Sequence, residues 1–357
     1  MHCATPRALG LYLRMRGIPS YALGDSSEMR VFEDPRIITN RFGGWASWHR
    51  TVSDYVMPQL RGDAEALGRV MDQWKPDVVV ATSFAAAARL AATVRGISLL
   101  QLSIYPQHQR QLPSTHSFGS QLRRAFAEAM GLEPSDQSLT RVAWGVGDDT
   151  VLLHDPVLVD APGRVVGFPY WDAGPAKKED VELTKSWLSQ SGRPKMLVTL
   201  GSFLGARQTA LWAEAAKVSE TLGLRTVFLG PRGFAHADLR ADLLAVGFVP
   251  LSTVFPLVDA VVHHGGIGTT FAAVRAGRPA AIVPQAFDQA HNAALVDRVG
   301  VGIDASKCTL ARAVERLLFE QRLAERATEI AAAVVPSEIA TSRVVDCIVQ
   351  LAEHGVA

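Results

Sequence analysis

The sequence predicts an α/β protein of two doubly wound domains, each a mainly parallel sheet with helices on both faces. Short apolar runs alternate with helical stretches through both halves of the chain, which is the rhythm of repeated βαβ units. The 357 residues suit two domains of ordinary size. Residues 168–180 combine two prolines, one glycine and a charge cluster, which is typical of an interdomain linker.

The first half of the chain predicts a domain with an unusual start. A helix is expected at 6–16, and a strand follows at 18–23. Because only five residues precede that helix, either the start of the sequence is truncated or wrongly assigned, or this domain lacks its first strand. The later elements of this half are expected at helices 58–74, 84–94 and 120–130 and at strands 78–81, 97–103 and 150–154.

The second half predicts a more regular alternation of strands and helices. Gly277 sits where a helix C-terminal cap belongs, and Ser252 is expected to cap a short helix. The expected strands are 195–200, 225–229, 246–249, 259–263, 278–283 and 301–304. The expected helices are 208–222, 252–257, 271–276, 291–299, 309–319, 322–334 and 337–353.

Composition and charge exclude several classes of protein. Lys and Arg number 36 against 35 Asp and Glu, so the net charge of +1 favours neither nucleic acid nor an anionic membrane. The three cysteines are scattered and lack zinc spacing, which fits a reduced cytoplasm. No apolar run approaches the ~20 residues of a membrane helix, and no signal-peptide pattern is present. We expect a cytoplasmic monomer or homodimer without stable membrane insertion.

A glycine-rich turn at 264–270 joins an expected strand to an expected helix. A helix start carries roughly half a positive charge and free N–H groups, so it binds phosphate. A diphosphate could approach the backbone where Cβ atoms are missing, at Gly265, Gly266 and Gly268. His264 would add an imidazole, and Thr269 and Thr270 would add hydroxyl donors. The alternative is a turn whose glycines serve only close packing.

This turn does not match a nicotinamide site. The G-x-G-x-x-G fingerprint follows the first strand of a domain, and its third glycine packs helix against strand. Phe271 occupies the place of that third glycine, and the turn lies near the end of the chain.

The stretch 258–289 resembles the signature of nucleotide-sugar-dependent inverting glycosyltransferases of the GT-B architecture, most of all the bacterial enzymes that glycosylate natural products. The resemblance is carried by the HHGG-x-GTT turn, the AGRP segment, Pro284 and the D-Q-x-x-N-A pattern at 288–293. It implies two Rossmann-like domains facing across a cleft. The implied segments are an acceptor-binding domain 1–170, a linker 171–181, a donor-binding domain 182–336 and a C-terminal helix 337–357 that crosses back.

The resemblance also implies a reaction. A hexose or deoxyhexose would pass from a UDP- or TDP-sugar to a hydroxyl or nitrogen of a hydrophobic small-molecule acceptor, with inversion. The sequence contains no evident D-x-D metal site, so no cofactor and no metal are expected.

Further site residues follow from the same resemblance. Ser202, in a second glycine loop, would contact the donor diphosphate together with the 264–270 turn. Phe248 and Val249 would border the nucleobase through their main chain. Asp288 and Gln289 would bind the hydroxyls of the donor sugar, although Asp288 could instead serve as a helix N-cap.

The resemblance also implies a catalytic base in the first loop of the chain. His2 lies near the position of the family's base, but a terminal histidine with no catalytic role is the alternative. Thr82 replaces the acidic residue that would orient such a base. Two other interpretations therefore stay open: a nucleotide-sugar-binding protein without transferase activity, and a different GT-B enzyme such as a sugar-nucleotide epimerase.

Overall fold

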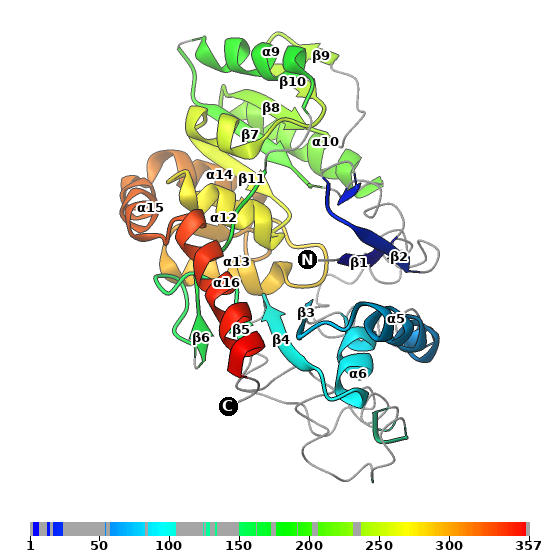
Figure 1. Cartoon of the computed structure of the whole chain (residues 1–357). Coiled ribbons are helices and arrows are strands. Elements are labelled where there is room, and N and C mark those ends of the chain that lie inside the picture. Colours follow the sequence, from blue (N-terminus) through cyan, green and yellow to red (C-terminus); the bar gives the residue numbers. More distant parts are fainter. Residues whose placement is uncertain are drawn as a thin grey trace. The chain divides into compact units, whose positions relative to one another are not determined.

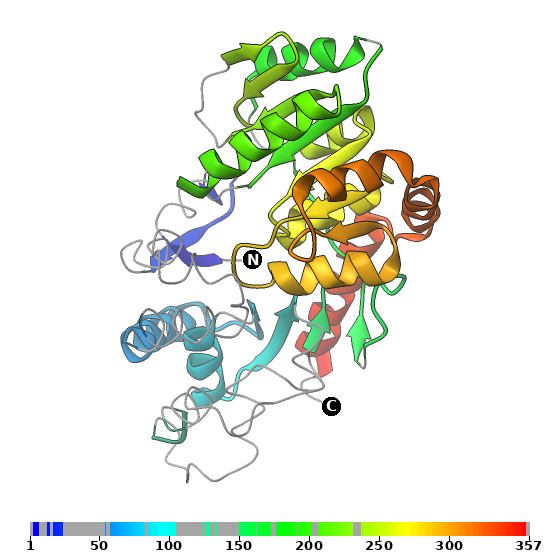
Figure 2. The same ribbon diagram turned by 180° about the vertical axis from the view of Figure 1, so that it is seen from behind.

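The computed structural model divides the chain into two compact units. Unit 1 contains the described residues up to Pro169 and from Val335 onward, and unit 2 contains Tyr170–Val334. Figures 1 and 2 show the ribbon from opposite sides. The structure describes residues 3–6, 13–14, 17–23, 54, 58–82, 85–104, 124, 126–128, 133, 150–161, 163–172, 176–190, 192–201, 206–230 and 237–354.

Unit 2 is built on a sheet whose strand order is β13-β12-β11-β7-β8-β10-β9 within the described residues. Every neighbouring pair is parallel except β10 with β9, which is antiparallel. The strands are β7 Lys195–Thr199, β8 Arg225–Leu229, β9 Ala237–Arg240, β10 Leu243–Val246, β11 Ala260–His263, β12 Ala280–Ile282 and β13 Gly302–Asp304.

Helices cover both faces of this sheet (Figure 1). Successive residues of β7 point to opposite faces, so Met196 and Val198 enter one core with α10 and α14, while Leu197 enters the other with α9, α11 and α12. The helices are α9 Lys178–Ser189, α10 Ala206–Thr221, α11 Leu251–Val254, the 3-10 turn η3 Phe255–Leu257, α12 Ile267–Arg275, α13 Gln289–Val299, α14 Leu310–Phe319 and α15 Gln321–Ala333.

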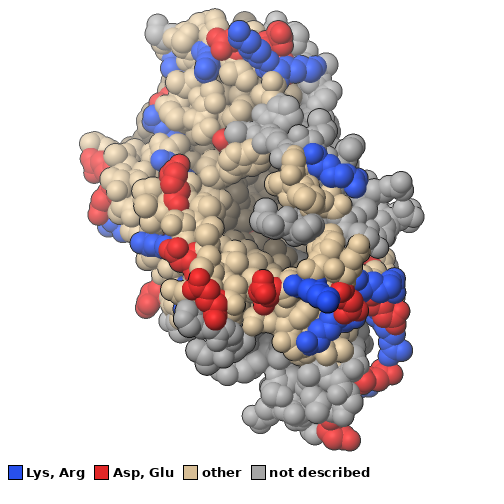
Figure 3. Space-filling view, in the orientation of Figure 1, with Lys and Arg blue, Asp and Glu red and all other residues tan. Residues whose placement is uncertain are grey.

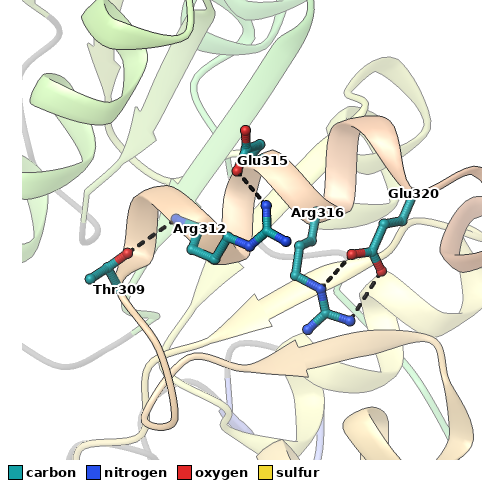
Figure 4. Close-up of polar contacts among 5 residues, drawn as sticks. All are labelled: Thr309, Arg312, Glu315, Arg316 and Glu320. Carbon is teal, nitrogen blue, oxygen red and sulfur yellow. Dashed lines mark hydrogen bonds and ion pairs between the residues drawn. The ribbon is translucent and has the colours of Figure 1, made fainter.

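Helix α14 shows how the local sequence sets a helix (Figure 4). The hydroxyl oxygen of Thr309 accepts the N–H of Arg312 at 3.3 Å and so caps the first turn. Arg312 pairs with Glu315, and Arg316 pairs with Glu320 through two bonds of 2.6 and 3.0 Å. Such surface pairs contribute only about 0.3–0.5 kcal/mol each. The helix is held mainly by its buried face, which contains Leu310, Ala313, Val314 and Leu317.

Unit 1 contains a four-stranded parallel sheet in the order β3-β4-β5-β6 within the described residues. Helices α5 and α6 pack in one cluster with Val79 and Leu99, while helix α16 packs in another with Leu100 and Val151. The elements are β3 Val78–Thr82, β4 Ser98–Ser103, β5 Thr150–Leu152, β6 Arg164–Val165, α5 Leu60–Trp74, α6 Ala86–Val94 and α16 Ser337–His354.

The start of α16 is fixed to unit 1 by two contacts. The Val335 N–H donates to Asp155 Oδ2 at 2.7 Å. Gly167 has a φ of +100°, and a Cβ placed on it would lie 2.9 Å from both Val335 Cγ1 and Ala340 Cβ. Only glycine combines this backbone conformation with so close an approach.

The expectation that the first strand is missing was wrong. Strand β1 Cys3–Pro6 pairs in parallel with β2 Ser20–Leu23. Pro6 was expected to be the first residue of a helix, a position that proline favours. In the structure Pro6 instead ends a short strand, another position that proline tolerates.

Two expectations in the second half were also wrong in detail. The strand expected at 246–249 is β10, which ends at Val246. Ser252 does not cap a helix, because α11 begins at Leu251 and has Pro250 in the N-cap position. Instead, the Ser252 N–H and hydroxyl both donate to the carboxylate of Asp172, at 2.6 and 2.9 Å. The hydrogen-bond acceptor at the start of α11 is therefore the carboxylate of Asp172, which precedes α9 in the chain.

Two elements of unit 2 were not expected from the sequence. Helix α9 begins at Lys178, inside the stretch expected to be a linker, and β9 forms the antiparallel edge of the sheet. The other strands and helices expected in the second half are all present, with ends that differ by a few residues.

The visible surface carries both signs of charge interspersed (Figure 3). This pattern agrees with the balanced composition. Within the part of the chain that the structure describes, no helix is long and apolar enough to cross a membrane.

Candidate functional site

The glycine turn lies where the strand order of unit 2 changes direction. From β7 the chain continues through β8 and β10 on one side, and then crosses to β11, β12 and β13 on the other. Open α/β sheets bind ligands at the carboxyl ends of strands at such a point. His263 at the end of β11 pairs with Thr199 at the end of β7, so the loops that follow both strands begin side by side.

Two glycines of the turn are required by close packing. Gly265 has a φ of +94°, and a Cβ on it would lie 2.6 Å from Ile282 Cγ2. A Cβ on Gly266 would lie 2.5 Å from His264 Nε2. The turn is further held by His263, whose Nδ1 accepts the Gly265 N–H at 3.0 Å. At Gly265 and Gly266, glycine is therefore required by close packing, as the alternative interpretation of the turn expected.

Gly268 is different, because a Cβ placed on it would meet no atom within 4 Å. It lies in the first turn of α12, whose N–H groups have no carbonyl partner inside the helix. The start of α12 is therefore open beside Gly268, and the helix dipole makes this opening attractive to an anion.

His264 is buried between the two loops. His264 is 7% exposed, and its ring lies against Gly201 and Gly266. Burial lowers the pKa of His264 to about 4, and a hydrogen bond with the backbone of Thr199 partly opposes that shift. The ring is therefore neutral at pH 7 before any ligand binds.

The two threonines of the turn differ in what their hydroxyls can do. Thr270 is 1% exposed, and its hydroxyl donates to the Gly266 carbonyl at 3.0 Å. That proton is used to hold the turn. Thr269 is 9% exposed and lies one residue nearer the open helix start, so its hydroxyl suits an anion better.

Asp288 reaches toward the same turn from the start of α13. Its carboxylate accepts Asn292 Nδ2 at 2.8 Å and a backbone hydrogen bond from Ile267. Burial raises the pKa of Asp288 to about 6, while hydrogen bonds from its own backbone, from Asn292 and from Ile267 oppose the shift. Asp288 occupies the N-cap position of α13 but makes no side-chain cap bond to that helix.

The side chain of Gln289 forms hydrogen bonds within the protein. Its residue is 2% exposed, and its Oε1 accepts the N–H groups of Gln285 and Ala286 at 2.7 and 2.9 Å. These bonds shape the loop after β12, in which Phe287 has a left-handed φ of 55°. Only the Nε2 group of Gln289 is left for a sugar.

Of the remaining expected site residues, the structure describes Phe248 and Val249 but not Ser202 or His2. Phe248 and Val249 follow β10 rather than forming its end. Val249 is 1% exposed. Ser202 and His2 lie outside the described residues, although Gly201 beside Ser202 contacts the His264 ring.

Asn292 was not among the site residues expected from the sequence. This side chain is 0% exposed and donates to the Gly265 carbonyl at 2.7 Å as well as to Asp288. The available signal was its position four residues after Asp288, which places the two on the same side of α13.

The chain is similar to several known proteins. Residues 235–351 match the family model for the C-terminal domain of erythromycin biosynthesis protein CIII-like proteins. The elloramycin glycosyltransferase ElmGT of Streptomyces olivaceus is 27% identical over 301 residues, which are 77% of this chain and 70% of that protein. The vancomycin aglycone glucosyltransferase of Amycolatopsis orientalis is 30% identical over 220 residues, 57% of this chain and about half (49%) of that protein.

A solved structure shares the fold over nearly the whole chain. The glycosyltransferase VinC, solved in complex with dTDP, aligns with a TM-score of 0.70 at 20% identity and covers 99% of this chain and 92% of its own. The expected fold class, α/β with parallel sheets in two domains of the GT-B type, is confirmed.

The relatives assign the chain to one enzyme class, the glycosyltransferases, and the solved structure agrees in fold. Within that class, the chain is a homologue of the enzymes that glycosylate natural products such as antibiotics. The resemblance carried by the glycine turn is thereby confirmed.

Proposed function

We propose that this chain transfers a hexose or deoxyhexose from a UDP- or TDP-sugar to a hydroxyl or nitrogen of a hydrophobic small molecule, with inversion at the anomeric carbon. The observation that carries this proposal is the open start of α12 beside Gly268, at the switch point of the unit 2 sheet. VinC, with the same fold, was solved with dTDP, and the relatives named above are glycosyltransferases.

The leaving diphosphate would be stabilised at this helix start. Negative charge grows on the diphosphate as the glycosidic bond breaks, and preorganised donors lower the energy of that transition state. The donors are the N–H groups of Gly266 and Gly268 and the hydroxyls of Thr269 and Ser202. The ring of His264 would reach the anion from the β7 side.

The nucleobase and the sugar would lie on either side of the diphosphate. The main chain of Phe248 and Val249, in the segment that follows β10, would bind the base edge. Asp288 would accept hydrogen bonds from sugar hydroxyls, with help from the Nε2 group of Gln289. Asp288→Ala should then reduce turnover of nucleotide sugar more than it weakens binding of bare nucleotide.

Deprotonation of the acceptor requires a base at the ligand-binding end of the sheet. Ligands bind at the carboxyl ends of parallel strands, and the carboxyl end of β1 is Pro6. His2 precedes the amino end of this strand, and residues 7–12 contain no His, Asp or Glu. A positioned base contributes about 10²–10⁴ in rate. We therefore propose slow transfer to hydroxyl acceptors.

We propose that the reaction needs no metal ion, because amides and hydroxyls at the α12 start can neutralise the diphosphate. Within the described residues, no group of three or more His, Cys, Asp or Glu is placed to hold a metal. Turnover in the presence of EDTA should equal turnover with Mg²⁺. A strict Mg²⁺ requirement would contradict this part of the proposal.

Calorimetric titration with TDP, UDP and free hexose tests the donor site. We expect binding of at least one nucleotide and none of the free hexose. His264→Ala should weaken nucleotide binding by about 1 kcal/mol, or up to about 3 kcal/mol if the bound ring is charged. Ser219→Ala is the control, since it removes a buried hydrogen bond to Leu224 in the same unit.

Activity is then measured with TDP- and UDP-glucose and a panel of hydrophobic phenols, and the anomeric configuration of the product is read by NMR. A product with inverted configuration supports the proposal. Tight nucleotide binding without any transfer would favour the nucleotide-sugar-binding alternative. Failure to bind TDP or UDP would exclude both.

A further inference from the structure

Asn292 connects two parts of the donor site that are far apart in sequence. It lies on α13 and is completely buried. Both N–H bonds of its amide are used, one toward the Gly265 carbonyl at 2.7 Å and one toward Asp288 Oδ2 at 2.8 Å. Because both partners are acceptors, the amide can only lie with Nδ2 toward them.

This orientation leaves Asn292 Oδ1 buried and without a partner among the described residues. An unsatisfied buried acceptor lowers the stability of a fold. A leucine of similar volume would avoid that penalty. Stability alone therefore does not explain an asparagine here, and the explanation has to come from what its amide holds.

The amide holds one peptide plane of the glycine turn. In a trans peptide the carbonyl and the N–H point in opposite directions. Since the Gly265 carbonyl points to Asn292, the N–H of Gly266 points away from α13. Gly265 has no side chain to fix its own rotation and adopts a φ of +94°, so the direction of this peptide depends on an external contact.

Asp288 strengthens the same arrangement. Its carboxylate accepts the second Asn292 bond and a backbone bond from Ile267, the first residue of α12. An ordinary N-cap would accept from its own helix, but no such side-chain cap bond is made to α13. The pair is thus directed at the turn and the start of α12, not at the helix that carries it.

We propose that Asn292 is a positioning residue for the donor: it fixes the Gly265–Gly266 peptide so that the Gly266 N–H joins the Gly268 and Thr269 N–H groups at the diphosphate. This inference rests on the proposed function of the turn. It adds that the anion site is completed by a residue of α13 that need not touch the ligand.

The test compares Asn292→Leu, which keeps volume and removes both donors, with Asn292→Ser, which keeps one donor. Thr226→Val is the matched control, because it removes a buried side-chain bond of 2.8 Å to Ser219 in the same unit. TDP affinity is measured by calorimetry, unfolding by thermal scan, and donor KM and kcat with a TDP- or UDP-sugar.

The expected result is a graded loss of nucleotide affinity. Asn292→Leu should raise the TDP Kd and the donor KM by about tenfold or more, as loss of one well-directed charge-assisted bond would. Asn292→Ser should fall between, the acceptor KM should stay unchanged, and Thr226→Val should keep its TDP Kd within about twofold of the wild type.

Two results would overturn the inference. In the first, folded Asn292→Leu binds TDP as tightly as the wild type, which removes Asn292 from the donor site and leaves the proposed function intact. In the second, the wild type binds neither TDP nor UDP, which removes the proposed function as well. If Asn292→Leu does not fold, the Asn292→Ser comparison decides, and an unchanged TDP Kd in that variant overturns the inference.

Discussion

The ring of His264 occupies the space in which Gly201 would carry a side chain: a Cβ on Gly201 would lie 2.9 Å from His264 Cε1. This contact joins the loop after β7 to the glycine turn after β11. The position of the imidazole at the anion site therefore depends on a glycine more than 60 residues away in sequence.

Replacing Gly201 should displace His264 and weaken nucleotide binding. Gly201→Ala adds a left-handed alanine, which costs about 1 kcal/mol, and also pushes against the ring. Gly223→Ala is the matched control, because Gly223 has a similar φ of +64° but open space around it. We expect Gly201→Ala to lose at least as much thermal stability as Gly223→Ala, and we expect weaker TDP binding only in Gly201→Ala. Equal TDP affinity in the two variants would show that the contact has no role in binding.

Gly268→Ala should weaken nucleotide binding without lowering the thermal stability of the protein. An alanine in a helix is more stable than a glycine by roughly 0.5–1 kcal/mol, and the new methyl group meets no atom of the protein. It would, however, occupy the space where the diphosphate is proposed to lie. We expect an unchanged or higher unfolding temperature and a TDP Kd raised by about tenfold.

Gly62→Ala, in helix α5, provides the control for that experiment. Gly62 also has open space at its Cβ position, but it lies in unit 1. Its TDP affinity should equal that of the wild type. Unchanged affinity in Gly268→Ala would move the diphosphate away from this opening.

Nucleotide binding should be linked to proton uptake by His264. The pKa of His264 is lowered to about 4, mainly by burial, so the free protein carries a neutral ring. A nearby anion raises the pKa of a histidine by about 1–3 units. At pH 6 the ring should therefore take up a fraction of a proton as TDP binds. Titrations in buffers of different ionisation enthalpy measure this uptake, and His264→Asn should reduce it. An identical proton count in the variant would contradict direct contact with the anion.

Asp288 should make the stability of unit 2 depend on pH. Its pKa is raised from 3.8 to about 6, mainly by burial, so above pH 6 the folded protein holds an unfavourable buried charge. This destabilisation is complete above pH 6 and disappears as pH falls toward 4. Asp288→Asn should thus stabilise the protein at pH 7.5 by about 1–3 kcal/mol and have little effect near pH 4.5.

Chemical unfolding at the two pH values measures this difference. Asp259→Asn is the control, because Asp259 is exposed and its carboxylate accepts the Lys195 N–H at 2.8 Å. If Asp288→Asn gives the same change in stability at both pH values, the buried carboxyl does not titrate in this range.

His2→Ala should change turnover by less than about threefold, since general-base assistance worth 10² or more requires a positioned group. The structural reason is that His2 precedes the amino end of β1, whereas parallel sheets carry ligands at carboxyl ends. Initial rates at saturating donor measure the effect. A loss of a hundredfold or more would establish His2 as the base.

The sequence predicted the unit 2 fold and the position of its turn well, because glycines and apolar periodicity report directly on local backbone. Gly277 has the left-handed φ of +63° expected after a helix end. The same signals could not divide the turn glycines by role. Gly265 and Gly266 are crowded by Ile282 and His264, whereas Gly268 is open, and these distances depend on tertiary packing.

Side-chain roles were predicted less well than positions. Thr270 and Gln289 lie where a ligand contact was expected, yet their polar atoms bond the backbone. Asn292 acts through residues 27 positions earlier in the chain, and no local pattern reveals such a bond. At the start of the chain, Pro6 fits a helix start and a strand end equally, and only the pairing with β2 distinguishes them.

The return of α16 to unit 1 has a consequence for synthesis on the ribosome. Cys347 and Leu351 of α16 complete the core around β4 and β5. The hydrogen bond from the Val335 N–H to Asp155 also forms only after this late part of the chain has been made. The described residues of unit 2, by contrast, all fall between Tyr170 and Val334. Although unit 1 is translated first, its core stays open until the last helix has left the exit tunnel. We therefore expect unit 2 to fold first, so that the first half of the nascent chain depends on chaperones for longest.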